Sequence, residues 1–114
     1  MSISFTGINE QVITFKTETQ LEAGTLVKIS ANGTVSACAA NDKIAGVVLF
    51  CRDKLAAVQV SGFAAVPYTG TAPTLGYAKL CAASKTEIKA DSTNGRELMV
   101  LETDTTEKIA GFML

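Results

Sequence analysis

The spacing of turn residues limits the fold of this chain more than any other feature, because it leaves segments too short for long helices. Asn32-Gly33 lies between two runs of strand-forming residues, 25–30 and 34–37. This pair is a strong hairpin signal, since a type I′ turn needs positive φ at both central residues. Asn94-Gly95 is a second candidate turn. Because no long stretch keeps a helical period, the sequence predicts an all-β fold, a small β-barrel or sandwich.

Alternation of apolar and polar residues indicates which side chains face the core. In the segment 12–16 we expect Ile13 and Phe15 on the apolar face, and in the segment 55–61 we expect Val58 inside and Gln59 outside. The apolar run 44–51 is typical of a strand covered on both faces. The expected strands are 12–16, 25–30, 34–37, 44–51, 55–61, 63–66, 78–82, 87–89, 98–101 and 109–114.

Two parts of the chain resemble each other. Residues 41–49 read NDKIAGVVL and residues 106–114 read TEKIAGFML, and each follows a related hairpin, 24–36 (GTLVKISANGTVS) and 76–89 (GYAKLCAASKTEIK). We interpret the pattern as two similar hairpin-containing halves, with chance similarity among Ala- and Val-rich strands as the alternative. Gly46 and Gly111 would then allow a bulge or a close backbone approach.

Length and charge restrict the classes of partner. A chain of 114 residues predicts one domain, here 11–114, preceded by an extended N-terminal arm, 1–10. Ten basic and eleven acidic residues leave a net charge of −1, which predicts neither direct nucleic-acid binding nor a membrane partner. The start, MSISFTGINE, lacks the pattern of a secretory signal, so we expect a cytoplasmic site of synthesis.

The inventory of reactive side chains argues against an enzyme. Histidine is absent, which excludes an imidazole base and a Ser-His-Asp triad. The cysteines at 38, 51 and 81 have neither disulfide nor zinc spacing, so we expect reduced, mostly buried thiols and no cofactor. Cys51 beside Arg52 is a weak candidate nucleophile. The acidic residues Glu102, Asp104 and Glu107 fit a solvated turn better than a calcium loop.

The hairpin 24–35 followed by Lys43-Ile44-Ala45-Gly46-Val47, the strand 58–63 and the closing segment 109–112 resemble tailed-phage capsid decoration proteins of the small β-barrel type. The resemblance covers about residues 20–114. It implies a virion protein made in the host bacterial cytoplasm. Such a protein binds the major capsid protein on the outer capsid surface, as a homotrimer, and stabilises the head.

Two segments are candidates for an interface. The N-terminal arm carries Ile3, Phe5 and Ile8 with no charge before Glu10, so it could add a strand to a neighbour's sheet or be the first strand of its own. The uncharged loop 67–76 carries Pro67, Tyr68 and Leu75, which suits either a subunit interface or an ordinary surface loop. We expect Tyr77 and Phe63 in the core.

Three functions compete at this stage. The first is capsid decoration, and the second is another phage structural module, from the tail or the fibre base. The third is a soluble module that binds a carbohydrate or small ligand, which usually needs several exposed aromatic side chains. The chain has five Phe, two Tyr and no Trp, which favours the structural roles.

Overall fold

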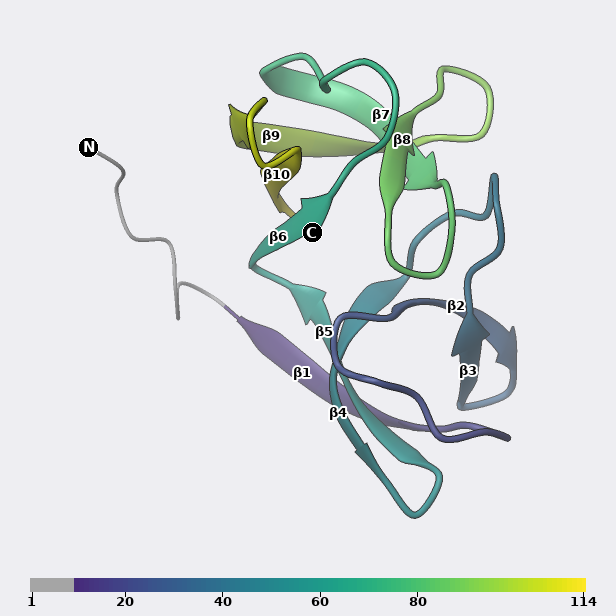
Figure 1. Ribbon diagram of the computed structural model, residues 1–114. Coiled ribbons are helices and arrows are strands. Elements are labelled where there is room, and N and C mark those ends of the chain that lie inside the picture. The colour runs from purple at the N-terminus through teal and green to yellow at the C-terminus, as the bar shows by residue number, and fades with distance from the viewer. Residues whose placement is uncertain (1–9) are drawn as a thin grey trace.

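The computed structural model describes residues 10–114, which form ten β-strands and no helix (Figure 1). The prediction of an all-β fold is therefore confirmed. The strands are β1 (Gln11–Lys16), β2 (Leu26–Ala31), β3 (Thr34–Ala37), β4 (Gly46–Arg52), β5 (Leu55–Ser61), β6 (Phe63–Pro67), β7 (Gly76–Ala82), β8 (Ile88–Ala90), β9 (Arg96–Asp104) and β10 (Ile109–Met113).

The first five strands close into a barrel in the order β1-β3-β2-β4-β5. The closing strand β1 runs antiparallel to β5 and parallel to β3, where Lys16 lies opposite Thr34. The predicted turn at Asn32-Gly33 joins β2 to β3. Only Gly33 has a positive φ (62°) and Asn32 does not, so the hairpin is confirmed but the type I′ geometry is not. We call β1–β5 the barrel.

The last five strands form a second sheet in the order β6-β10-β9-β7-β8. Its pairings repeat those of the barrel strand for strand: β6 is antiparallel to β10, β10 to β9, β9 to β7 and β7 to β8. A single parallel bridge joins Tyr68, just after β6, to Ile88 in β8, as the parallel pairing joins β1 to β3. The halves therefore share one topology, in which β1–β5 correspond to β6–β10.

A bulge fixes the correspondence between the halves residue by residue. In β4 an extra residue, Leu49, falls between the pairs Val48–Val58 and Phe50–Ala57. In β9 the extra residue is Leu101, between the pairs Val100–Phe112 and Glu102–Gly111. In this alignment the segment 54–58 (KLAAV) corresponds to 108–112 (KIAGF), and the carbonyls of Lys54 and Lys108 accept equivalent backbone hydrogen bonds.

The predicted equivalence of Gly46 with Gly111 is therefore wrong, although both halves exist. Lys43-Ile44-Ala45-Gly46 leads into β4, whereas Ile109-Ala110-Gly111, directly after Lys108, begins β10, and β10 corresponds to β5. Both glycines still lie where backbone or side chains approach closely, because a Cβ on Gly46 would lie 2.5 Å from the Gln59 carbonyl oxygen. Only Gly111 adjoins a bulge.

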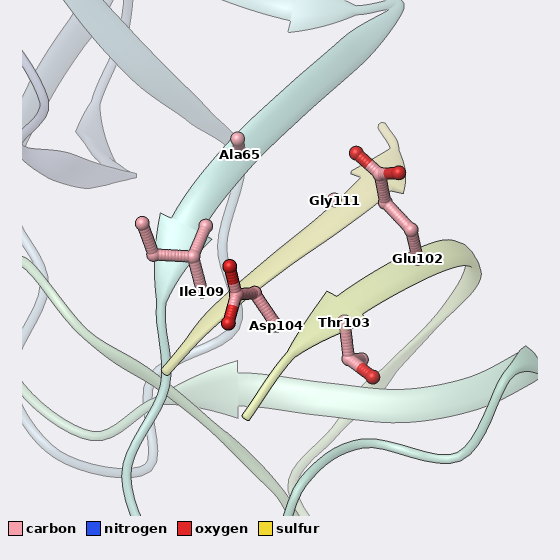
Figure 2. A pocket seen from close by; sticks show the side chains of 6 residues that line it. All are labelled: Ala65, Glu102, Thr103, Asp104, Ile109 and Gly111. Carbon is pink, nitrogen blue, oxygen red and sulfur yellow. The ribbon is translucent and has the colours of Figure 1, made fainter. Parts of the chain in front are cut away.

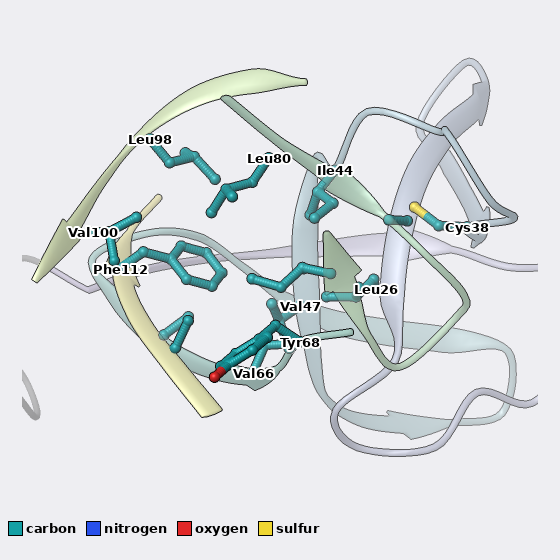
Figure 3. Packing of buried hydrophobic residues seen from close by; sticks show 14 residues of the cluster. Leu26, Cys38, Ile44, Val47, Val66, Tyr68, Leu80, Leu98, Val100 and Phe112 are labelled. Carbon is teal, nitrogen blue, oxygen red and sulfur yellow. The ribbon is translucent and has the colours of Figure 1, made fainter. Parts of the chain in front are cut away.

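The core consists of two clusters, and one of them is shared between the halves. The barrel interior holds Val35, Val48 and Val58 with their neighbours. The larger cluster lies inside the curve of the second sheet, around Phe112, and is completed by side chains of the barrel half (Figure 3). These barrel-half side chains are Leu26, Cys38, Ile44 and Val47.

Because of this shared cluster, part of the outer surface of the barrel is buried inside the protein. Gln59 was expected to point to solvent, and it does point away from the barrel centre, as its partner Val47 does. It is nevertheless buried, and its Nε2 donates hydrogen bonds to the carbonyl oxygens of Phe63 (2.7 Å) and Ser61 (3.2 Å). The run 44–51 is likewise covered on both faces at Val47 and Val48, but not at Phe50, which is exposed.

Candidate interaction surface

Four apolar side chains cross the outer face of the second sheet in one row. Tyr77 in β7 pairs with Met99 in β9, Met99 pairs with Met113 in β10, and Met113 pairs with Phe63 in β6. Residues paired directly across neighbouring strands present their side chains on the same face. Tyr77 is 70% exposed and Met99 36%, while Met113 and Phe63 are half-buried. We call these four residues the apolar row.

The barrel has an equivalent row of residues, but most of that row is buried by other parts of the protein. The corresponding residues are Leu26, Val47, Gln59 and Val12, paired in the same order. Leu26 and Val47 are buried in the cluster shared with the second sheet, and Gln59 is buried beside the Phe63 carbonyl. In the apolar row, by contrast, Tyr77 and Met99 remain exposed among the described residues. Tyr77 was expected in the core, and this expectation is wrong because only the barrel's version of the row faces the other half.

A hollow of about 340 Å³ lies on the same outer face, toward the turn between β9 and β10. Ala65 and Gly111 line it with little or no side chain, and Ile109, Glu102 and Asp104 surround them (Figure 2). The two carboxylates point to the same side of the sheet as the Ile109 side chain. We call this region the acidic hollow.

Local contacts hold the acidic hollow in shape. Asp104 Oδ1 accepts backbone hydrogen bonds from Thr106 (2.9 Å) and Glu107 (3.0 Å), which fixes the carboxylate at the start of the turn. The Phe63 ring crosses Gly111, so that a Cβ at Gly111 would lie 2.7 Å from the ring. Glycine at this position therefore accommodates the close ring contact beside the bulge.

The positions in the barrel that correspond to the acidic hollow carry opposite chemistry. Phe50 stands where the second sheet has Glu102, and Arg52 stands where it has Asp104. Phe50 is 64% exposed and Leu55 is 48% exposed. Lys16 pairs with Leu55 on the neighbouring strand and is also exposed. We call Phe50, Arg52, Leu55 and Lys16 the barrel face.

The residues that the sequence predicts for an interface have different positions in the structure. Ile3, Phe5 and Ile8 lie outside the described residues. Pro67 and Leu75 are exposed, as expected for a loop surface. Tyr68 is only 4% exposed and packs in the shared core, so its expected surface position is wrong. The parallel bridge to Ile88 places Tyr68 in the core. The uncharged composition of the loop does not predict this bridge.

The remaining candidates for chemistry are the carboxylates and the three cysteines. No cluster of three Cys, Asp or Glu side chains among residues 10–114 could hold a metal ion. Burial raises the pKa of the Cys38 thiol to about 11, and burial also raises the pKa of Cys81, so both are protonated at neutral pH. The half-buried Cys51 donates its thiol to Gln20 Oε1 at 3.6 Å.

Comparison with models of protein families and with curated protein sequences found no match for this chain. Function is therefore inferred from the chain's own residues. Within residues 10–114 we find no helix with the length and apolar character needed to cross a bilayer.

Proposed function

We propose that this protein is a capsid decoration protein of a tailed phage or prophage, which binds the major capsid protein as a homotrimer and stabilises the head from outside. One observation carries the proposal: within residues 10–114, Tyr77 and Met99 of the apolar row are exposed, whereas Leu26 and Val47 at the equivalent positions of the barrel are buried. Interface cores are enriched in Tyr, Phe and Met, and the row consists of these residues alone.

Two further features support a docking role. The small barrel with a repeated half fits the fold that the sequence resemblance implies. The exposed apolar residues also lie on regular strands whose neighbours are tightly paired, so that they form a pre-shaped surface with little ordering cost on binding. In the proposed function the apolar row is the surface that contacts the shell.

Electron microscopy of heads with and without the protein tests this proposal. We expect added density at symmetry-related positions on the outer surface. The double variant Tyr77→Glu/Met99→Glu should lose this density, because it places two charges in the contact. The control Ile29→Glu changes an apolar residue on β2 of the barrel whose exposure, 56%, lies between those of Tyr77 and Met99, and it should bind normally.

Circular dichroism would first establish that both variants fold. Heads without added density, or binding by the row variant as strong as by the control, would overturn the proposal. Selective binding to purified tails instead of heads would also overturn it, and would favour a tail module.

A further inference from the structure

The two halves share one strand topology but carry side chains of different charge and polarity at equivalent positions. On the barrel face, an aromatic ring and a guanidinium project from β4 at Phe50 and Arg52. On the second sheet, β9 has carboxylates at the matching positions, Glu102 and Asp104. The partner strand there has Gly111 where the barrel has Ala57, and the Phe63 ring crosses Gly111, so the exposed Ala65 is the open floor of the acidic hollow.

We propose that the acidic hollow of one copy of this protein receives the barrel face of a second copy. Phe50 of the second copy would lie over Ala65, beside the Phe63 ring that crosses Gly111, in the hollow of about 340 Å³. Arg52 would pair with Glu102 and Asp104, since the planar guanidinium matches carboxylates in a bidentate geometry. This contact would hold together the homotrimer of the proposed function. The inference rests on the proposed function only for where the trimer acts.

Charge disfavours the symmetric alternatives. If two barrel faces met, Arg52 and Lys16 would face the same cations of the other copy, and if two hollows met, Glu102 and Asp104 would face carboxylates. Like charges placed together across an interface are strongly unfavourable. The contact is therefore heterologous, with a different surface on each side. Such contacts repeat around a closed ring when the rotation between neighbours allows closure, as it does in a trimer.

The hollow and the exposed part of the apolar row consist of different residues, so both can be occupied. Ile109 at the hollow and Met113 in the row are the two ends of β10, which corresponds to about 13 Å along a strand. Both surfaces lie on one outer face and adjoin where the Phe63 ring crosses Gly111, but the exposed side chains of Tyr77 and Met99 do not line the hollow. A neighbouring copy and the shell can therefore bind the same sheet.

A pair of complementary variants tests the proposal. Phe50→Glu disables the barrel face and leaves the hollow intact, while Ala65→Arg fills the hollow and leaves the barrel face intact. Both positions are exposed, so both variants should fold. By sedimentation analysis we expect wild-type rings, as well as rings of the Ile29→Glu control, whereas each variant alone should be a monomer.

An equimolar mixture of the two variants gives the decisive result. One intact hollow and one intact barrel face remain in the mixture, so 1:1 pairs should form and nothing larger. The affinity of these pairs should fall as salt rises, because the contact includes exposed ion pairs. A monomeric wild type, variants that associate like the wild type, or a mixture without pairs would each overturn the proposal.

The outcome is separable from that of the proposed function. A monomer that still adds density to heads would refute the self-association alone, while rings that bind no heads would refute capsid decoration alone. If Ala65→Arg lost head binding and kept the wild-type ring, the hollow would belong to the shell contact, and the present assignment would be overturned.

Discussion

Replacing Gly46 with alanine should destabilise the protein far more than the same change at Gly111. A Cβ on Gly46 would lie 2.5 Å from both the Gln59 carbonyl oxygen and Val58 Cγ1. The carbonyl belongs to β5, and it cannot retreat without disturbing the pairs that join β4 to β5. At Gly111 the nearest atoms, 2.7 and 2.8 Å away, are the tip of the Phe63 ring, which is half-buried and can swing aside.

The magnitudes follow from these neighbours. Overpacking a core costs about 1–3 kcal/mol, and we expect Gly46→Ala to lie at about 3 kcal/mol because backbone must move. For Gly111→Ala the ring shift is offset by the better strand propensity of alanine, which is worth about 0.5–1 kcal/mol. Its net effect should stay within about 1 kcal/mol.

Thermal and urea unfolding followed by far-UV circular dichroism measure both changes. At about 4 °C per kcal/mol for a domain of this length, Gly46→Ala should lower Tm by about 12 °C and Gly111→Ala by about 4 °C or less. The reasoning would be refuted if Gly111→Ala were the more damaging change, or if the two variants were equally stable.

Three further predictions concern single side chains. Alkylation at pH 7.5 should modify Cys51 first, while Cys38, with a pKa of about 11, should react only after unfolding; mass spectrometry of the labelled peptides checks this order. Asp42 forms a 2.8 Å ion pair with Lys28, which together with a backbone hydrogen bond lowers its pKa. The Asp42 carboxylate therefore contributes to stability at pH 6, and this contribution is lost as pH falls below about 4. The difference in unfolding free energy between wild type and Asp42→Asn should shrink in acid. A difference that stays constant with pH would contradict the role assigned to the ion pair. Phe112→Ala should lose about 3–5 kcal/mol in urea unfolding because the ring is fully buried, and a loss below about 1 kcal/mol would contradict its place in the core.

Local chemistry made most strands predictable. The segment 55–61 matches β5, and the segment 25–30 is displaced by one residue from β2. The turn at Gly33 follows from the residues themselves, because few side chains tolerate its positive φ. None of these features depends on how the two halves pack, so the sequence contains the information needed for them.

The surfaces were less predictable, because exposure is decided by contacts between the halves. Nothing local distinguishes Leu26, which is buried under the second sheet, from Tyr77 at the equivalent position, which is exposed. Phe50 lies in the apolar run 44–51, and the pattern of that run predicts burial at every position. The repeated Lys-Ile-Ala-Gly letters also misled the alignment, and only the matching bulges at Leu49 and Leu101 establish the correct one.

The shared core predicts that the two halves unfold together. Leu26 lies in the barrel but packs in the cluster of the second sheet, and its backbone N–H donates to the Lys85 carbonyl at 2.7 Å. Both tyrosines, Tyr68 and Tyr77, follow β5 in the chain, so tyrosine fluorescence reports on the second sheet while far-UV circular dichroism reports on both halves. Leu26→Ala should therefore move both transitions by the same amount, about 2–5 kcal/mol.

Coincident transitions are the signature of one cooperative unit. Val35→Ala gives the matched control from the barrel's own cluster, and it too should move both signals together if the barrel supports the second sheet. A fluorescence transition that stayed at its wild-type midpoint in Leu26→Ala would mean that the second sheet holds its fold without the barrel. In that case the burial of the barrel's row would be incidental, and the exposure of the apolar row would no longer single it out as a surface made for a partner.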